Sequence, residues 1–190
     1  LNSVTRLPCP RGKPPGRNEV VTDILTLPHA ALRRRSVAVE QVDGNIRMLA
    51  ECMFAAMYAA NGVGLAAPQV GVAAHVIVVD VSLPHETADP LCLINPEILE
   101  YSEETISFEE GCLSLPGIYA EITRPREIRV QYLDLQGEQH LLVARDFLSV
   151  CLQHEMDHLK GRLFIDHLSA FRRNRLIRTF QNQQRHRRRQ

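Results

Sequence analysis

The segment LSVCLQHEMDHLKGR, residues 148–162, constrains the fold most strongly, because it carries two histidines four residues apart. Residues i and i+4 of a helix lie on one face, one turn apart. His154 and His158 therefore suit two ligands of a single divalent ion. Glu155 lies about 100° around the same helix from His154, where a general base for a metal-bound water belongs. The alternative is a surface helix that carries two histidines by chance.

We predict that this helix runs from about Phe147 to Lys160. Asp146 precedes it as the expected N-cap, and Gly161 follows it as a C-terminal stop. Positions 147, 150, 151 and 154 are spaced as i, i+3, i+4 and i+7, so they share one helix face that leads to the metal-binding pair.

The third ligand decides the class of metal site. In zinc endopeptidases of the metzincin type the signature continues as HExxHxxGxxH, and here Phe164 stands at the third histidine position. His167 lies beyond Gly161, where the helix is expected to end. Upstream, Cys112 lies in EEGCLSLPG, residues 109–117, and a thiolate beside two imidazoles suits Fe²⁺, Zn²⁺, Ni²⁺ or Co²⁺. On its own Cys112 reads as a buried free cysteine, so these patterns leave the third ligand open.

The rest of the chain predicts few helices among several strands. The expected elements are a helix over 45–60, a buried strand over 75–81, a hairpin over 127–144 and a basic helix over 168–180. Asp43 offers an N-cap for the first of these helices. This arrangement, with short connections, predicts the α+β class.

The composition is that of an ordinary globular protein, with 45% hydrophobic and 23% charged residues among 190. This length fits one domain with a sizeable core. No run of about 18 apolar residues occurs, so a transmembrane helix is not expected. The five cysteines are an odd number without a CxxC pair, which favours a reducing compartment over a disulfide framework.

The formal net charge of zero hides basic ends on an acidic body. All acidic residues lie between Glu19 and Asp166, while residues 171–190 hold eight arginines. Such ends indicate either an anionic partner, most commonly nucleic acid, or a solvated tail. Residues 1–19 read as a flexible basic arm, a tag or a leader, including the end of an organellar transit peptide.

Three motifs together resemble those of the peptide deformylase family: GVGLAAPQ at 62–69, EGCLS at 110–114 and QHEMDH at 153–158. They stand in that family's order, and the resemblance covers about residues 20–168, which would form the catalytic domain. Residues 169–190 are left as a basic, arginine-rich C-terminal helix or tail. The resemblance implies an α+β fold with antiparallel β-sheets packed around a central metal-binding helix.

The resemblance also implies an activity and a set of roles. The activity is removal of the formyl group from the N-terminal formylmethionine of newly synthesised polypeptides, with release of formate. The implied metal ligands are Cys112, His154 and His158, holding one divalent ion, natively Fe²⁺, for which Zn²⁺, Ni²⁺ or Co²⁺ can substitute. Glu155 would be the catalytic acid/base, while the Gln69 side chain and the Leu113 backbone N–H would stabilise the oxyanion. Gln69 also has a structural interpretation, as a buried amide that holds the loop containing Gly62 and Gly64 (the glycine loop) in place.

The substrate pocket is predicted from helix spacing and from family analogy. The expected substrate-binding residues are Gly62, Val63, Gly64, Phe108, Glu110, Val150 and Cys151. The glycines would let a substrate strand approach the backbone closely. Asp157 is expected to point away from the metal and to pair with an arginine such as Arg124.

The expected partners are nascent formylated polypeptides and, through the basic tail, the ribosome. No membrane and no sequence-specific nucleic acid are expected. The implied location is the bacterial cytoplasm, or alternatively a plastid or mitochondrion. Two other readings stay open: a zinc endopeptidase, against which Phe164 argues, and a catalytically silent relative that binds nascent chains or ribosomes.

Overall fold

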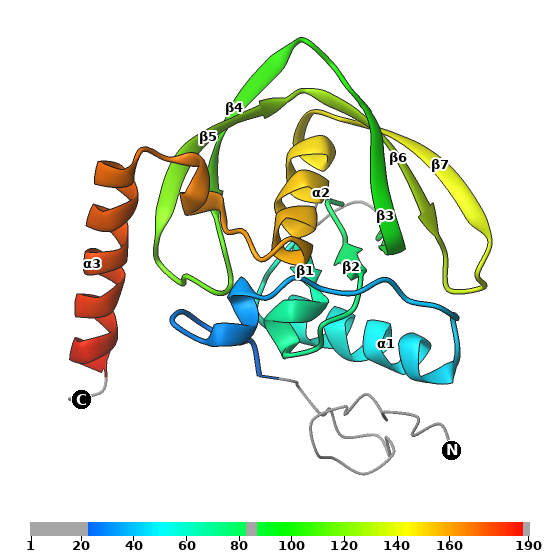
Figure 1. The fold of residues 1–190 in the computed structure, drawn as a ribbon, viewed down its shortest axis with the longest axis horizontal. Coiled ribbons are helices and arrows are strands. Elements are labelled where there is room, and N and C mark those ends of the chain that lie inside the picture. Colours follow the sequence, from blue (N-terminus) through cyan, green and yellow to red (C-terminus); the bar gives the residue numbers. More distant parts are fainter. Residues whose placement is uncertain (1–22, 83–86, 188–190) are drawn as a thin grey trace.

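The computed structural model describes residues 23–82 and 87–187, and the basic arm predicted for residues 1–19 lies outside them. Figure 1 shows α2 (Asp146–Leu159) at the centre, with strands on several sides of it and α1 (Gly44–Ala59) below. This arrangement confirms the predicted α+β class, with antiparallel sheets around the helix that carries both histidines. Among the described residues, no helix combines the length and the apolar character that a membrane crossing requires.

Two antiparallel sheets flank the central helix. The larger sheet has the strand order β1–β2–β3–β6–β7. Its strands are β1 (Gly64–Ala66), β2 (Val76–Val79), β3 (Leu91–Tyr101), β6 (Glu127–Leu133) and β7 (Gln139–Arg145). The smaller sheet is a two-stranded ribbon of β4 (Thr105–Gly111) and β5 (Tyr119–Pro125). Since α2 contacts strands of both sheets, it carries its side chains into the space between them.

The remaining elements are short turns of helix and one terminal helix. They are η1 (Ala30–Arg33), η2 (Ala67–Val70), η3 (Phe164–His167) and α3 (Ala170–Arg187). α3 lies at one side of the molecule in Figure 1. Its Phe180 is buried in an apolar cluster with Ile118 and Phe164, so this helix packs on the body of the protein.

The first predicted helix forms almost as expected, from Gly44 to Ala59. Its N-cap is Asp43, whose carboxylate accepts hydrogen bonds from the backbone N–H groups of Asn45 and Ile46 at 2.9 and 3.0 Å. This cap satisfies two of the donors that the first turn leaves free. The strand predicted over 75–81 is shorter, and the hairpin predicted over 127–144 is β6 and β7.

The prediction that Asp146 caps α2 is wrong. β7 runs directly into the helix, so the N-cap is Arg145 and Asp146 is already the first helical residue, with φ at 49°. The carboxylate of Asp146 accepts a hydrogen bond from Arg126 Nε at 2.6 Å. The basic helix predicted to end at Phe180 continues to Arg187.

Gly161 ends α2, as predicted, and its surroundings exclude a larger residue. Its φ is 70°, and a Cβ at this position would lie 2.6 Å from the carbonyl oxygen of Arg33. The backbone N–H of Gly161 reaches the carbonyl of His158 at 3.0 Å, and that of Arg162 reaches the carbonyl of Asp157 at 2.9 Å. Gly161 therefore closes the helix and lets the residue 33 segment pack against its end.

We expect Gly161→Ala to destabilise the protein more than Gly137→Ala does. Gly137 also has a positive φ, 83°, but a Cβ there would meet its nearest atom only at 3.9 Å. Gly137→Ala should thus cost the backbone strain alone, about 1–2 kcal/mol. Gly161→Ala should add an overpacking cost of about 1–3 kcal/mol. Urea unfolding of both variants measures the difference, and equal losses would contradict the close contact with Arg33.

Candidate metal centre and active site

Three potential metal ligands from two distant segments converge in the structure. Cys112 follows β4, and His154 and His158 lie one turn apart on α2. One ligand atom from each lies within 4.8 Å of the others, and Cys112 Sγ is 3.3 Å from His158 Nε2. Cys112 is half-buried and both histidines are buried. This donor set fits a borderline divalent ion such as Fe²⁺ or Zn²⁺, because one thiolate and two imidazoles suit these metals.

Glu110 fixes the orientation of one histidine. Its carboxylate lies 2.7 Å from His154 Nδ1, which leaves Nε2 of His154 as the nitrogen directed to the cluster. Burial by itself would raise the pKa of Glu110. The hydrogen bonds from His154 and Arg124 outweigh this effect, so the pKa of Glu110 lies below its usual value. An ionised carboxylate behind a metal-binding imidazole holds the ring and increases its basicity.

Arg124 links Glu110 to the central helix. Its guanidinium is 4% exposed and donates to both oxygens of Glu110, at 2.5 and 3.0 Å, and to Asp157 at 2.9 Å. This confirms the expected partnership of Asp157 and Arg124. His167 Nε2 lies 2.7 Å from the same Asp157 oxygen. Although burial opposes the charged form, His167 and Arg124 lower the pKa of Asp157 to about 2.

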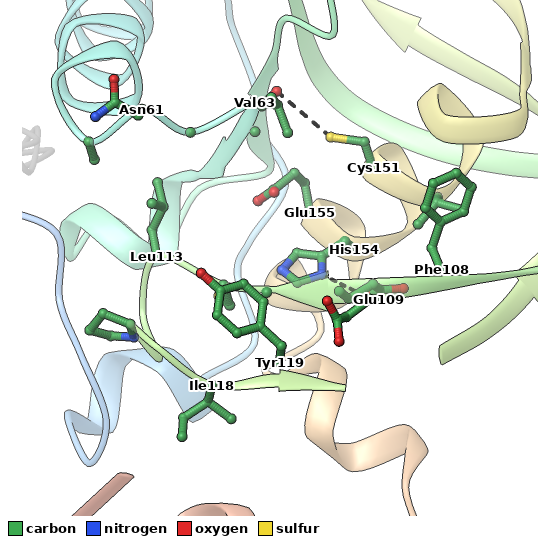
Figure 2. Close-up of a pocket in the computed structure, with 18 of the residues that line it drawn as sticks. Asn61, Val63, Phe108, Glu109, Leu113, Ile118, Tyr119, Cys151, His154 and Glu155 are labelled. Atoms are coloured by element: carbon green, nitrogen blue, oxygen red, sulfur yellow. Dashed lines mark hydrogen bonds and ion pairs between the residues drawn. The ribbon is translucent and has the colours of Figure 1, made fainter. Parts of the chain in front are cut away.

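Glu155 lies beside the cluster with part of its carboxylate unpaired. The side chain is 5% exposed, and within the described residues its Oε2 has no hydrogen-bond partner. Burial is the main cause that raises the pKa of Glu155 to about 7. Figure 2 shows its carboxylate above His154, directed into the space in front of the helix. A buried carboxyl group of this kind can accept and return a proton near neutral pH.

Gln69 faces the same space from η2. Its Oε1 accepts a hydrogen bond from the backbone N–H of Ala66 at 2.7 Å. Its Nε2 lies 3.2 Å from Ser114 Oγ and 3.6 Å from Cys112 Sγ. Gln69 therefore connects the segment around Ala66 to the segment that holds Cys112 and Ser114. The same amide group borders the three potential metal ligands.

A cleft of about 570 Å³ opens onto these residues. The residues predicted to bind substrate all line it: Gly62, Val63, Gly64, Phe108, Glu110, Val150 and Cys151. Phe147 completes the apolar wall, with its ring centroid 5.4 Å from that of Phe108. Sequence reasoning missed Tyr119, which also lines the cleft, because it belongs to no spacing pattern.

The two glycines of the loop are required by packing inside the protein. A Cβ on Gly64 would lie 2.5 Å from Glu155 Oε1 and 3.0 Å from Cys151 Sγ. A Cβ on Gly62 would lie 2.7 Å from Leu113 Cδ1. The backbone at Gly62 and Gly64 therefore lies directly against residues that are predicted to act in catalysis. Packing inside the protein is thus a second reason for glycine at these positions, besides the expected approach of a substrate strand.

Taken together, the fold and the site define a metal-dependent hydrolase. A model of the family described as Polypeptide deformylase matches residues 21–174. The chain is 48% identical over 157 residues to the peptide deformylase of Phenylobacterium zucineum, which covers 83% of this chain and 93% of that protein. It is 46% identical over 164 residues to the peptide deformylase of Teredinibacter turnerae, covering 86% and 96%.

Solved structures agree with this relationship. The peptide deformylase of Ehrlichia chaffeensis matches with a TM-score of 0.83 and 41% identity, over 87% of this chain and 97% of that one. The peptide deformylase of Legionella pneumophila matches with a TM-score of 0.83 and 38% identity, over 90% and 99%. The chain belongs to the polypeptide deformylase family. It is therefore an enzyme, a metal-dependent hydrolase that deformylates new polypeptides.

We expect Arg124→Met to destabilise the protein strongly, because it leaves the carboxylates of Glu110 and Asp157 buried without their cation. Breaking a buried ion pair in this way costs about 3–5 kcal/mol. The matched control is Arg129→Met, which removes an exposed pair with Glu100 and should cost at most about 1 kcal/mol. Urea unfolding of both variants without metal makes the comparison. Similar losses of unfolding free energy in the two variants would contradict the stabilising role assigned to the buried ion pairs of Arg124.

Proposed function

We propose that this enzyme releases formate from the N-terminal formylmethionine of nascent chains, using one divalent ion held by Cys112, His154 and His158. The observation that carries the proposal is the convergence of these three ligand atoms within 4.8 Å, beside the buried carboxylate of Glu155. When bound, such an ion polarises a carbonyl oxygen and lowers the pKa of a coordinated water to about 7. The proposed native ion is Fe²⁺, with Zn²⁺, Ni²⁺ or Co²⁺ as substitutes.

Glu155 is the proposed acid/base of the reaction. Its unpaired Oε2 is free to accept a proton from the attacking water and to pass it to the leaving amine of methionine. Positioned proton transfer of this kind contributes about 10²–10⁴-fold to the rate. Gly64 supports this role, because the missing Cβ leaves the space that Glu155 Oε1 occupies.

Gln69 and Leu113 are the proposed oxyanion donors. The Nε2 group of Gln69 borders Cys112, and the backbone N–H of Leu113 follows Cys112 directly in the chain. Negative charge that develops on the formyl oxygen would accept hydrogen bonds from both. Each such donor is worth about 2.7–4 kcal/mol in the transition state.

The apolar wall of the cleft is proposed to hold the methionine side chain. Phe108, Phe147 and Val150 line the cleft together with Cys151, and the rings of Phe108 and Phe147 pack against each other. An unbranched thioether side chain suits such a surface, because it is flexible and makes favourable contacts with aromatic rings. The formyl group would then lie beside the metal ligands, with the rest of the peptide leaving along the cleft.

The proposal is tested by formate release from a formyl-Met peptide, with the acetyl-Met peptide as control. Protein prepared without oxygen should be loaded with Fe²⁺ or Zn²⁺ in parallel. We expect release from the formyl peptide only, with higher kcat for the iron form. No release from a protein with measured metal bound would overturn the proposed reaction, and equal kcat with both ions would overturn the preference for iron.

For Glu155→Gln we expect kcat to fall about 10²–10⁴-fold while the protein keeps its metal. The amide has nearly the same shape but cannot carry the proton. The control is Glu51→Gln on the exposed face of α1, which should leave kcat and metal content unchanged. Metal content per chain and kcat are measured on the same samples. A variant that keeps its metal and its turnover would remove Glu155 from the mechanism.

We further propose that the C-terminal helix α3 docks on the ribosome, in the bacterial cytoplasm or in an organelle with formylated initiation. Arg172, Arg175, Arg178 and Arg185 are exposed on α3, whereas Phe180 packs into the core. Exposed arginines on one helix suit contacts with RNA phosphates, which dominate such binding and weaken with salt. Because Phe180 is buried, truncating the helix would disturb the fold, and charge removal is the cleaner test.

We expect Arg175→Gln/Arg178→Gln to weaken co-sedimentation with ribosomes several-fold at low salt. The matched control is Arg34→Gln/Arg35→Gln, two exposed arginines next to η1. Both double variants should keep the deformylase activity of the parent protein. Equal co-sedimentation of the two variants would show that α3 is not the docking element.

A further inference from the structure

His167 contacts the central helix from η3, the turn that follows this helix in the chain. Its Nε2 lies 2.7 Å from Asp157 Oδ2, and its side chain is partly exposed. Within the described part of the chain, it stands outside the group of potential ligands formed by Cys112, His154 and His158. Because Asp157 is ion-paired with Arg124 at 2.9 Å, it is a carboxylate and can only accept. His167 therefore acts on α2 as a hydrogen-bond donor and not as a ligand.

A continuous chain of hydrogen bonds leads from His167 to a candidate metal ligand. The oxygen of Asp157 that His167 contacts also accepts from Arg124 Nη1. Arg124 donates from Nε and Nη2 to the two oxygens of Glu110, at 2.5 and 3.0 Å. Glu110 Oε2 in turn lies 2.7 Å from His154 Nδ1. His167 is thus the outer end of a chain whose inner end is an imidazole of the candidate metal centre.

The guanidinium of Arg124 is shared between two buried carboxylates. Glu110 is 5% exposed and Asp157 is 8% exposed. A buried carboxylate keeps its charge at low cost only where several donors reach it. His167 supplies Asp157 with a donor besides Nη1 of Arg124. Without it, Asp157 would attract the guanidinium more strongly towards the helix, and Glu110 would lose part of the contact that holds it against His154.

The same turn also supports His154 directly. Phe164 begins η3, and its ring stacks on that of His154, with centroids 5.9 Å apart and planes inclined by 22°. Phe164 stands where the metzincin signature has its third histidine, so this segment packs a ring on a ligand instead of supplying one. η3 is itself anchored, because Asp166 pairs with Arg33 of η1. The turn therefore holds His167 in a fixed place behind the candidate metal centre.

We propose that His167 is a positioning residue of the metal centre, which keeps the imidazole of His154 oriented for the ion through Asp157, Arg124 and Glu110. This inference rests on the proposed function, since it concerns the same divalent ion. Hydrogen-bond partners behind metal-binding histidines typically contribute about 10–100-fold to metal affinity or activity. His167 lies further along the chain than Glu110, so we expect an effect of about tenfold, at the lower end of that range.

The test compares Co²⁺ binding by the parent protein, His167→Leu and His167→Gln. Each protein is freed of metal under reducing conditions, and the Co²⁺ dissociation constant is measured by competition with a chelator of known affinity. The absorption that a cysteine thiolate gives to bound Co²⁺ reports the site of Cys112, because the other group of potential ligands, at residues 134, 138 and 140, contains no cysteine. This readout depends on the metal site and not on turnover.

We expect His167→Leu to raise the Co²⁺ dissociation constant about tenfold. The visible absorption bands of the bound ion should also change, because they depend on how the ligands are arranged. His167→Gln should keep most of the affinity and the parent spectrum, since its amide can still donate to Asp157. Rescue by glutamine assigns the effect to the hydrogen bond and not to the volume of the side chain.

Two controls separate positioning from a general loss of stability. Ile165→Val removes a buried methyl group from the same turn, so it should lower the urea midpoint without changing the Co²⁺ dissociation constant. His140→Leu removes another histidine that pairs with an aspartate, Asp134, at 2.6 Å. That pair lies on the β6–β7 hairpin and has no part in the chain of hydrogen bonds, so this variant should bind Co²⁺ at Cys112 as the parent does.

The outcomes distinguish this inference from the proposed function. A parent protein that binds no Co²⁺ at Cys112 would overturn both the metal centre and the role of His167. A parent that binds metal but releases no formate from a formyl-Met peptide would overturn the proposed reaction alone. If His167→Leu binds Co²⁺ as tightly as the parent, only the role of His167 is wrong. The same conclusion follows if His167→Gln binds as weakly as His167→Leu, or if Ile165→Val weakens binding equally.

Discussion

The buried guanidinium of Arg124 is the interaction on which the site depends. The candidate metal ligands come from two separate parts of the chain, because Cys112 lies between the strands of the β4–β5 ribbon and both histidines belong to α2. Arg124 binds Glu110 of the ribbon and Asp157 of the helix, so it fixes one part against the other. Burying two carboxylates and one guanidinium is costly unless every charge is paired, as it is here. The position of Cys112 relative to the histidines is therefore set by an ionic contact that tolerates little displacement.

The opposite wall of the cleft is positioned by close packing. Gly64 leaves space for Glu155 and Cys151, and Gly62 leaves space for Leu113. A methyl group at either position would have to move a buried neighbour, since protein interiors are densely packed. The glycine loop is also held by Gln69, whose amide bonds to Ala66 on one side and to Ser114 on the other. The three sequence motifs thus form one contact network around the metal site.

Sequence patterns predicted the elements whose signals are local. The i, i+4 spacing of His154 and His158, the cap Asp43 and the stop Gly161 each act within one or two turns of helix, so they can be recognised without the fold. Asp146 was mispredicted because the strand before it runs into the helix with no loop. The place of Tyr119 in the cleft depends on strand register, which a single sequence does not specify. The proposal of Cys112 as third ligand needed the family resemblance, since the histidines beside it lie more than forty residues away in the sequence.

α2 is unusual in burying polar residues along most of its length. Most of these residues are hydrogen-bonded, and the atoms that are not belong to the candidate site. Ser149, Gln153 and Asp157 are buried but hydrogen-bonded, so they connect the helix to its surroundings. Two buried atoms on this helix have no partner within the described residues, Glu155 Oε2 and His158 Nδ1. Unsatisfied buried polar atoms are rare because each costs about 1–3 kcal/mol. Here both belong to the HExxH sequence, and the helix keeps them although an apolar residue would pack at lower cost. At the proposed acid/base Glu155 this cost leaves a carboxylate oxygen unpaired beside the candidate metal ligands, so stability and turnover should trade against each other at position 155.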